Sequence, residues 1–217
     1  MFIHHKQRGI SLIELIMFIV IVSVALAGIL LVMNVTTKGS ADPLVHKQAL
    51  AIAESLLEEV ELMPFTYCDP DDPTAATATS ATVGAGACTV KVEGIGPEAA
   101  YANQAPAETR YYSATAPFDN VNDYNGCQMN TGTASPGCDT TGSLGIRDIN
   151  NNAIGPATGY SASIAVAALT SAFSGIAALD VNSTPQVLLI TVTVTGPDNV
   201  PVVLEGIRTR YSPKAVP

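Results

Sequence analysis

The sequence contains no tryptophan and only three histidines, and charged residues make up only 13% of its 217 positions. Acidic residues outnumber basic ones by 19 to 10, so the formal net charge at pH 7 is −9. Such a chain lacks the basic surface that attracts nucleic-acid phosphates, and we expect no nucleic-acid partner. The shortage of histidine excludes a His-rich metal site and argues against Ser-His-Asp or Cys-His catalysis.

Sequence motifs of enzymes are missing as well. The sequence has no phosphate loop of the form GxxxxGK(S/T), and no nucleophile stands in a recognisable pattern with a base. We therefore expect neither an enzymatic activity nor a bound cofactor. A membrane-anchored enzyme or binding module is the weaker interpretation, because either one needs a convergent polar site.

A long apolar run near the N-terminus dominates what the sequence does contain. Lys6 and Arg8 precede it, Glu14 stands directly before it, and Ser23 is its only polar residue between positions 15 and 33. A helix of these 19 residues reaches about 28 Å at about 1.5 Å per residue, close to the thickness of the hydrocarbon layer. We predict a membrane-spanning helix with the two basic residues on the cytoplasmic side.

The carboxylate of Glu14 needs a partner in this setting. A carboxylate in hydrocarbon costs about 2.5–3.5 kcal/mol at mid-membrane and less toward either end. Cleavage after Gly9 gives Ile10 a free α-amine, a cation that can neutralise Glu14 of the same chain or of an adjacent subunit. Pairing between subunits would fix their lateral position in an assembly.

The stretch Arg-Gly-Ile-Ser-Leu-Ile-Glu at residues 8–14, followed by the apolar helix, resembles the leader and N-terminus of type IV pilins and pseudopilins. The resemblance implies cleavage between Gly9 and Ile10 by a prepilin peptidase, N-methylation of Ile10, and Glu14 as the assembly carboxylate. It also implies membrane lipid, other major and minor pilins and an inner-membrane assembly platform as partners. Isoleucine at position 10, where phenylalanine is commoner, and the absence of proline from 10–33 favour a minor subunit.

Two simpler interpretations of the N-terminus compete with this one. Ala25-Leu26-Ala27 has the small-x-small form that signal peptidase cleaves, but the apolar run continues six residues further, to Met33. A signal peptide would also carry Glu14 inside its apolar region. A plain single-pass anchor leaves Glu14 unexplained.

The region after the apolar run predicts a second helix. Residues 34–42 are polar and contain Gly39, so we expect the helix to loosen or break there and to restart with Asp42 as N-cap and Pro43 in the first turn. Apolar residues then recur at helical spacing up to Pro64. The predicted organisation is a leader (1–9), a transmembrane and assembly helix (10–33), a hinge (34–42), an amphipathic helix of the globular domain (43–64), and an extracytoplasmic domain with loops and antiparallel sheet (65–217).

Residues 41–59, with the pattern AxAESLLEE, narrow the resemblance. They look like the corresponding segment in D-type minor pilins of the mannose-sensitive haemagglutinin (MSHA) system. Similar helices occur in V-type minor pilins and in I-type pseudopilins of type II secretion. The stretch 118–126 is similar to a Phe-Asp-x-Val-x-Asp-Tyr/Phe-x-Gly segment of the same minor pilins.

Four cysteines on the translocated part of the chain predict an oxidising compartment and disulfide bonds. Cys68 and Cys88 bracket residues 74–87, which are nearly all Ala, Thr, Ser and Gly and predict a mobile loop without a core. Cys127 and Cys138 flank a second loop and most simply pair with each other. Four cysteines permit three connectivities, so the alternative pairings stay open.

Two stretches rich in Asp and Asn raise the question of calcium. Asp119, Asp123 and Asn125 offer hard oxygen ligands, and residues 148–152 begin like an EF-hand loop. The first stretch does not have EF-hand spacing. The second fails at Ala153, which stands where glycine is needed. Asx-rich turns are common without metal, and we predict no metal site.

Alternation of apolar and small polar residues predicts strands in the C-terminal third. It runs through 160–166, 188–195 and 202–211, with a turn at 196–199 (Gly-Pro-Asp-Asn). We expect an antiparallel sheet whose apolar face is covered by the helix at 43–64. The predicted fold class is α+β, pilin-like: a long N-terminal helix, membrane-spanning in its first half and amphipathic in its second, on a C-terminal antiparallel sheet.

Taken together, these features indicate a structural protein. The interpretation is a minor pilin of an MSHA-like type IV pilus, held in the inner membrane by a single span, processed after Gly9, and then incorporated into or priming a fimbrial fibre for cell adhesion. The first alternative is a type II secretion pseudopilin, which shares every one of these motifs.

Overall fold

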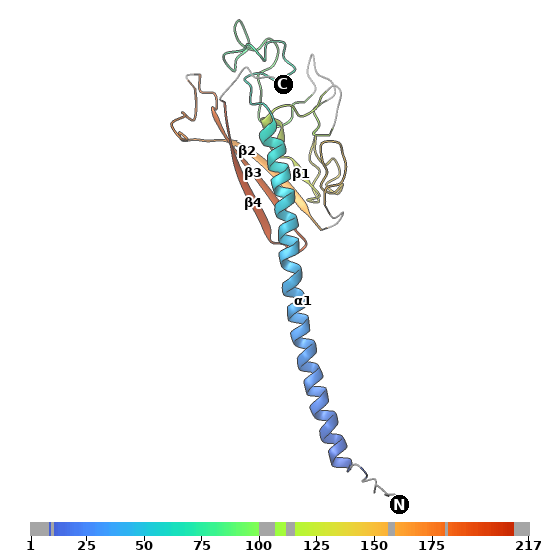
Figure 1. Cartoon of the computed structure of the whole chain (residues 1–217). Coiled ribbons are helices and arrows are strands. Elements are labelled where there is room, and N and C mark those ends of the chain that lie inside the picture. Colours follow the sequence, from blue (N-terminus) through green and yellow to red (C-terminus); the bar gives the residue numbers. More distant parts are fainter. Residues whose placement is uncertain are drawn as a thin grey trace, which may run out of the picture. The chain divides into compact units, whose positions relative to one another are not determined.

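The computed structural model describes residues 9, 11–99, 107–111, 116–155, 159–180 and 182–210, with the backbone alone for residues 35–42. The chain divides into two compact units, Met1–Leu44 and Val45–Pro217. A single long helix, α1 (Leu12–Leu62), contributes to both units (Figure 1).

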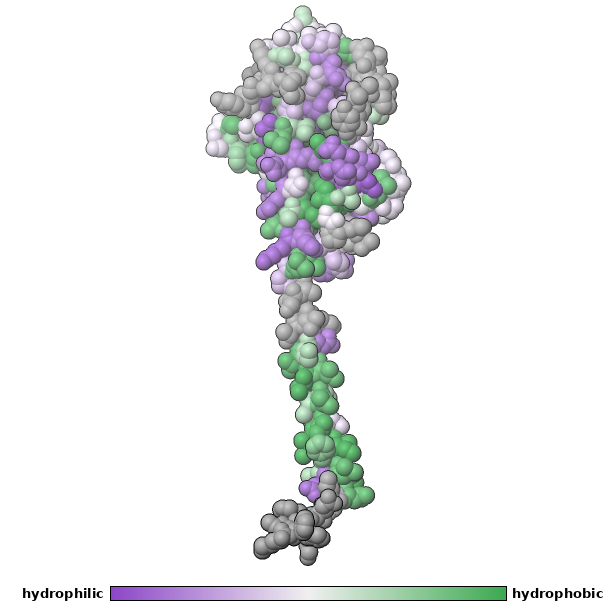
Figure 2. Space-filling view, turned by 45° about the vertical axis from the view of Figure 1, so that its right-hand side comes forward, coloured by the Kyte–Doolittle hydropathy of each residue, from purple (hydrophilic) through white to green (hydrophobic). Residues whose placement is uncertain are grey.

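The first unit contains the apolar part of α1. Leu12–Asn34 is a 23-residue stretch with mean hydropathy 3.2, and none of its most apolar window is buried within the chain. Figure 2 shows the resulting apolar surface, which extends along this part of the helix. The one hydroxyl in the run is satisfied locally, because Ser23 Oγ donates to the Ile19 carbonyl at 2.6 Å. By length and composition this helix can cross a bilayer.

The predicted interruption of the helix at residues 34–42 was wrong. α1 continues through this segment, and Pro43 lies inside it and starts no new helix. Proline removes one backbone hydrogen bond, that to residue 39, and costs about 3 kcal/mol in a helix interior. The turns before and after it keep their own bonds, so the helix propagates past the defect. Motion at 34–42, the other part of the hinge prediction, stays a prediction.

The second unit is built on a four-stranded antiparallel sheet of order β1-β2-β3-β4. The strands are β1 (Gln128–Met129), β2 (Ser161–Ala168), β3 (Val187–Thr195) and β4 (Pro201–Thr209). The three long strands are those that the alternating pattern predicts. β1 was not predicted, since a strand of two residues is too short to show a period.

One face of the sheet and one face of α1 form the core. Alternate residues of the strands are buried, and the second half of α1 lies across them (Figure 1). The helix contributes a stripe of fully buried side chains at helical spacing: Ala49, Ile52, Ala53, Leu56 and Val60. The α+β architecture with the helix on the sheet is therefore confirmed.

A glycine in β4 lets the helix approach this closely. A Cβ placed on Gly206 would lie 2.9 Å from Leu57 Cδ1 and closer still to the Glu61 carboxylate. Real Cβ atoms are essentially never that close to another atom. A side chain at position 206 would therefore require the Leu57 and Glu61 side chains to turn away from β4.

The loops hold two disulfides, Cys68–Cys88 and Cys127–Cys138, the two pairings that the sequence favours. The prediction that residues 74–87 contribute no core was wrong. Ala75 and Ala78 are buried, and with Tyr67 and the Cys68–Cys88 bridge they form a second, small hydrophobic cluster. Side chains as small as alanine pack here because the bridge already supplies the centre of the cluster.

Candidate functional site

The first candidate site is the start of α1. Glu14 lies in the first turn of the helix and is exposed, among apolar neighbours that are also exposed. A carboxylate in the first turn is favoured by the partial positive charge of the helix N-terminus. Among the described residues Glu14 has no side-chain partner. Gly9 precedes the helix, and Ile10, the predicted N-methylated residue, lies outside the described residues.

The second candidate site lies in the loops of the second unit, Val45–Pro217, called the compact unit from here on, and consists of carboxylates. Oxygen atoms of different side chains there fall into four overlapping groups of three, each group lying within 4.8 Å of one another. Seven residues take part, and we call them the acidic cluster: Asp69, Asp71, Glu93, Glu98, Glu108, Asp119 and Asp123. They come from four separate segments of the chain, so only the folded protein assembles them.

A short 3-10 helix, η1 (Val121–Tyr124), positions the residues at 119–123. Its capping box binds Asp123 Oδ2 to the backbone N–H groups of Asn120, at 2.7 Å, and Asp119, at 3.0 Å. The other oxygen, Asp123 Oδ1, is buried and has no hydrogen-bond partner. The loop after residue 93 joins η1 through a bond from Gly96 N–H to the Asn122 carbonyl, at 2.9 Å.

Backbone bonds also bring Glu98 and Glu108 together. Glu108 N–H donates to the Glu98 carbonyl at 3.1 Å, and Glu98 N–H donates to Glu108 Oε2 at 2.8 Å. Glu98 Oε1 accepts from Gly94 N–H at 3.2 Å and lies 3.9 Å from Lys91 Nζ. Glu98 Oε2 is buried without a partner. The fold thus directs one oxygen of each of several carboxylates toward other carboxylates.

The electrostatics of the cluster follow from this crowding. Burial, and then the neighbouring carboxylates, raise the pKa of Glu93 and of Asp123 well above their usual values. The same causes, with Asp69 first among the neighbours, raise the pKa of Asp119 to about 8. Burial also raises the pKa of Glu98. Left to itself, the cluster retains protons at neutral pH.

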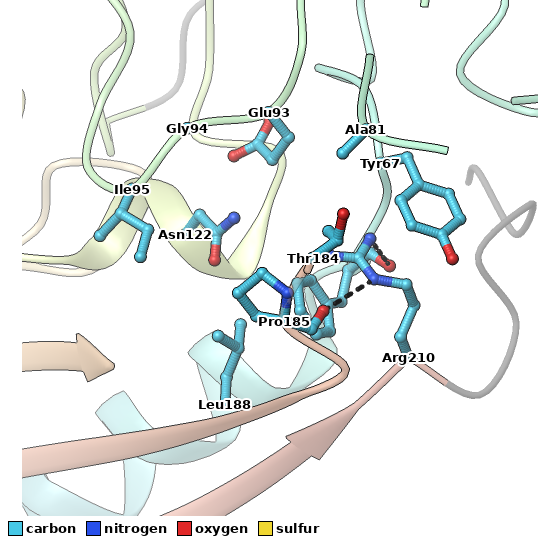
Figure 3. A pocket seen from close by; sticks show the side chains of 11 residues that line it. Tyr67, Ala81, Glu93, Gly94, Ile95, Asn122, Thr184, Pro185, Leu188 and Arg210 are labelled. Carbon is cyan, nitrogen blue, oxygen red and sulfur yellow. Dashed lines mark hydrogen bonds between the residues drawn. The ribbon is translucent and has the colours of Figure 1, made fainter. Parts of the chain in front are cut away.

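A cavity of about 170 Å³ opens beside the cluster, and Glu93 and Asn122 are among the residues that line it. Figure 3 shows these two residues on one side and Arg210 on the other. The Arg210 guanidinium lies 3.7 Å from the ring centroid of Phe65 and 4.4 Å from that of Tyr67. It also donates to the Phe65 and Pro185 carbonyls at 3.3 Å. Arg210 is therefore held by its own contacts, and burial lowers its pKa to about 10.

The residues that the sequence offered as calcium ligands lie in three different local structures. Asp119 and Asp123 belong to the acidic cluster. Asn125 does not, because its Oδ1 accepts from Val166 N–H at 3.0 Å and helps fix β2. Asp148 accepts from Asn152 N–H at 2.7 Å, which makes the second stretch a self-contained turn.

Sequence reasoning missed four further members of the acidic cluster: Asp69, Glu93, Glu98 and Glu108. These residues are spread over 40 positions of irregular chain, with no spacing that a motif could recognise. Asp69 stands next to Cys68, whose disulfide fixes that segment. Only the backbone bonds of the folded loops reveal the cluster.

Comparison with known proteins bears on the first site. Residues 4–30 match the family model of the prokaryotic N-terminal methylation motif. No curated protein and no solved structure matches the chain. The match spans residues 4–9 of the leader, Ile10, Glu14 and most of the apolar helix, and it supports a pilin-like or pseudopilin protein processed by prepilin peptidase and assembled with other pilins.

Proposed function

We propose that this protein is a minor pilin of a type IV pilus, similar to the D-type subunits of the MSHA system, with a structural and not an enzymatic role. The observation that carries the proposal is the methylation motif joined to the 23-residue apolar stretch Leu12–Asn34, with Glu14 in its first turn. The helix-on-sheet domain that follows supports it. The MSHA assignment rests on the resemblance of residues 41–59 and 118–126.

The proposed mechanism starts in the inner membrane, with residues 1–9 on the cytoplasmic side and the compact unit outside. Prepilin peptidase cleaves after Gly9, and the new N-terminal amine of Ile10 is methylated and keeps its positive charge. The apolar stretch then moves from lipid into a bundle of similar helices, where its apolar contacts persist. Glu14 pairs with the amine of an adjacent subunit and fixes the axial register.

The experiment is a Glu14→Val substitution with Ser23→Val as the matched control. Both variants remove one polar group from the apolar stretch, but the Ser23 hydroxyl is already bonded to the Ile19 carbonyl. We expect Glu14→Val to leave membrane insertion and processing intact and to reduce incorporation into sheared fibres at least tenfold. Ser23→Val should incorporate normally. Equal incorporation of the two variants would remove the proposed role of Glu14.

Mass spectrometry of the mature N-terminus tests the processing step. A methylated isoleucine at position 10 is the expected result. A chain that begins at Met1 would identify a plain anchor, and one that begins at Gly28 would identify a secretory signal; either result contradicts the proposal.

A type II secretion pseudopilin is the second candidate, because the methylation motif is common to both classes. Deletion of the gene separates them. Loss of surface attachment with normal protein secretion supports the minor pilin. Accumulation of secreted proteins in the periplasm with normal attachment supports the pseudopilin.

A further inference from the structure

We infer that the acidic cluster is a calcium site that ties together the loops of the compact unit. The inference does not depend on the proposed function, since it concerns side chains far in sequence from the methylation motif. It follows from the placement of oxygen atoms, from the lack of partners for several of them, and from the local charge.

The first step is the geometry: the carboxylate oxygens of the acidic cluster are spaced like the ligands of a metal ion. The cluster contains four groups of three carboxylate oxygens, and the oxygens of each group lie within 4.8 Å of one another. The groups share members: Asp123 belongs to two of them, and so does Glu98. Oxygens bound to one calcium ion lie at 2.3–2.6 Å from it, which places them within about 5 Å of each other. The spacing in the cluster fits this coordination.

The second step is the state of the individual oxygens. The side chains of Asp123 and Glu98 are only 1% and 5% exposed, and Asp123 Oδ1 and Glu98 Oε2 have no hydrogen-bond partner. The buried atoms Glu93 Oε1 and Asp119 Oδ1 also have no hydrogen-bond partner. Buried polar atoms are almost always partnered, so four unpartnered oxygens that belong to one cluster indicate a ligand that binds oxygen.

The third step is charge. Lys91 lies beside Glu98, but one lysine cannot balance the seven carboxylates when they ionise. Two nearby arginines are engaged elsewhere: Arg110 forms an ion pair with Glu59, and Arg210 donates to backbone carbonyls between two aromatic rings. A doubly charged cation supplies what these side chains do not.

The chemistry of the donors selects the metal. All members of the cluster are carboxylates, and the four cysteines are bound in disulfides. The cluster therefore lacks the sulfur and nitrogen ligands that are typical of zinc sites. Each group takes its three carboxylates from irregular loops, and such a site suits the variable geometry of Ca²⁺ better than the strict octahedron of Mg²⁺. Glu93, a member of the cluster, also lines the cavity described above (Figure 3).

Calcium bound at any one of these groups would join two or three of the segments 69–71, 93–98, 108 and 119–123. Because these segments converge only in the folded state, the ion binds the native protein and not the unfolded chain, and it raises stability by mass action. The consequence would be a loop region that is rigid in calcium and loosened without it.

The test uses the full chain in detergent, freed of metal with a chelator. Titration with CaCl₂, followed by calorimetry and by thermal unfolding, should give saturable binding. We expect Tm to rise by about 5–10 °C when free Ca²⁺ is a hundredfold above Kd. MgCl₂ at the same concentration should raise Tm much less.

The matched variants are Asp119→Asn inside the cluster and Asp148→Asn outside it. Each exchanges one carboxylate for an isosteric amide in an Asx-rich loop. Asp119→Asn should weaken Ca²⁺ binding at least tenfold, and Asp148→Asn should leave it unchanged. Absence of a Tm rise in the unaltered chain overturns the inference even if a variant fails to fold. Equal effects of Mg²⁺ and Ca²⁺, or equal Kd values for the two variants, also overturn it.

Discussion

Two regions of the compact unit bury carboxylates in opposite ways. Directly after the Cys127–Cys138 loop, Asp139 is fully buried and accepts backbone N–H bonds from Asn130, Thr141, Gly142 and Leu144 at 2.7–3.1 Å. Burial by itself would raise the pKa of Asp139, but these hydrogen bonds hold the pKa below its usual value. The charge is thus satisfied entirely within the chain.

The acidic cluster shows the other outcome. Four of its members, Asp69, Glu98, Glu108 and Asp123, are buried like Asp139. The carboxylates of the cluster nevertheless face one another, and the pKa of Asp119 and of Asp123 is raised by burial and by the neighbouring carboxylates. Burial is therefore not what distinguishes the two regions. The number of N–H donors that the local backbone turns toward the carboxylate decides whether it is satisfied by the chain or needs a partner from outside.

Glu59 on α1 represents the internal solution in its strongest form. It accepts two bonds from the Arg110 guanidinium, at 2.8 and 2.6 Å, and a third from the Tyr124 hydroxyl at 2.9 Å. Arg110 is only 2% exposed. This ion pair fastens a loop to the helix that covers the sheet.

The largest expected effect comes from breaking that pair. Arg110→Ala leaves Glu59 partly buried without its cation, which should lower the free energy of unfolding by about 3–5 kcal/mol, measured by urea denaturation. The double variant Arg110→Met with Glu59→Met should recover most of the loss, because it removes both charges. A loss below about 1 kcal/mol for Arg110→Ala would show that the internal partner matters little.

An intermediate effect should appear when the same isosteric change is made in both regions. Asp139→Asn points an amide N–H₂ at backbone N–H groups and should lower the free energy of unfolding by about 1–3 kcal/mol. Asp119→Asn, in chelator at pH 8, removes a charge from among like charges and should leave stability unchanged or raise it. Thermal unfolding of the two variants side by side measures the difference. Destabilisation of the same size in both would erase the distinction between the regions.

These two regions also mark the limit of sequence-based prediction here. The strands at 160–166 and 188–195 and the helix stripe were predictable, because apolar periodicity is a local property. Cys127 and Cys138 were predictable as a pair from their short separation. The cluster was not, because its members meet through loop–loop hydrogen bonds such as Gly96 N–H to the Asn122 carbonyl, for which no periodicity exists.

The prediction of a helix break before Pro43 was wrong for a related reason. Proline is a strong local signal for a helix start, and the sequence contains the matching N-cap at Asp42. Cooperative propagation from the turns on both sides overrode it. Local rules predicted what is local in this chain and missed what neighbouring turns and distant loops impose.

The smallest expected effect is the pH dependence of the calcium-free protein. The pKa of Asp119 is raised to about 8 in the folded chain by burial and by Asp69, Glu108, Asp71 and Glu98, whereas in the unfolded chain it is about 3.9. A carboxyl with a raised folded pKa contributes stability that is complete below about pH 4 and is lost as the pH rises through about 8. In chelator, Tm should therefore fall by a few degrees between pH 5 and pH 8.

Calcium should reverse this trend and so sharpen the comparison. Ca²⁺ competes with protons for the same oxygens, so the rise in Tm on adding it should be small at pH 5 and largest at pH 8. Asp119→Asn should flatten the pH dependence in chelator, while Asp139→Asn, whose carboxyl has a lowered pKa, should leave the slope between pH 5 and pH 8 as it is. If both variants kept the slope of the unaltered chain, Asp119 would not be its origin, and the contrast drawn here between Asp119 and Asp139 would not hold.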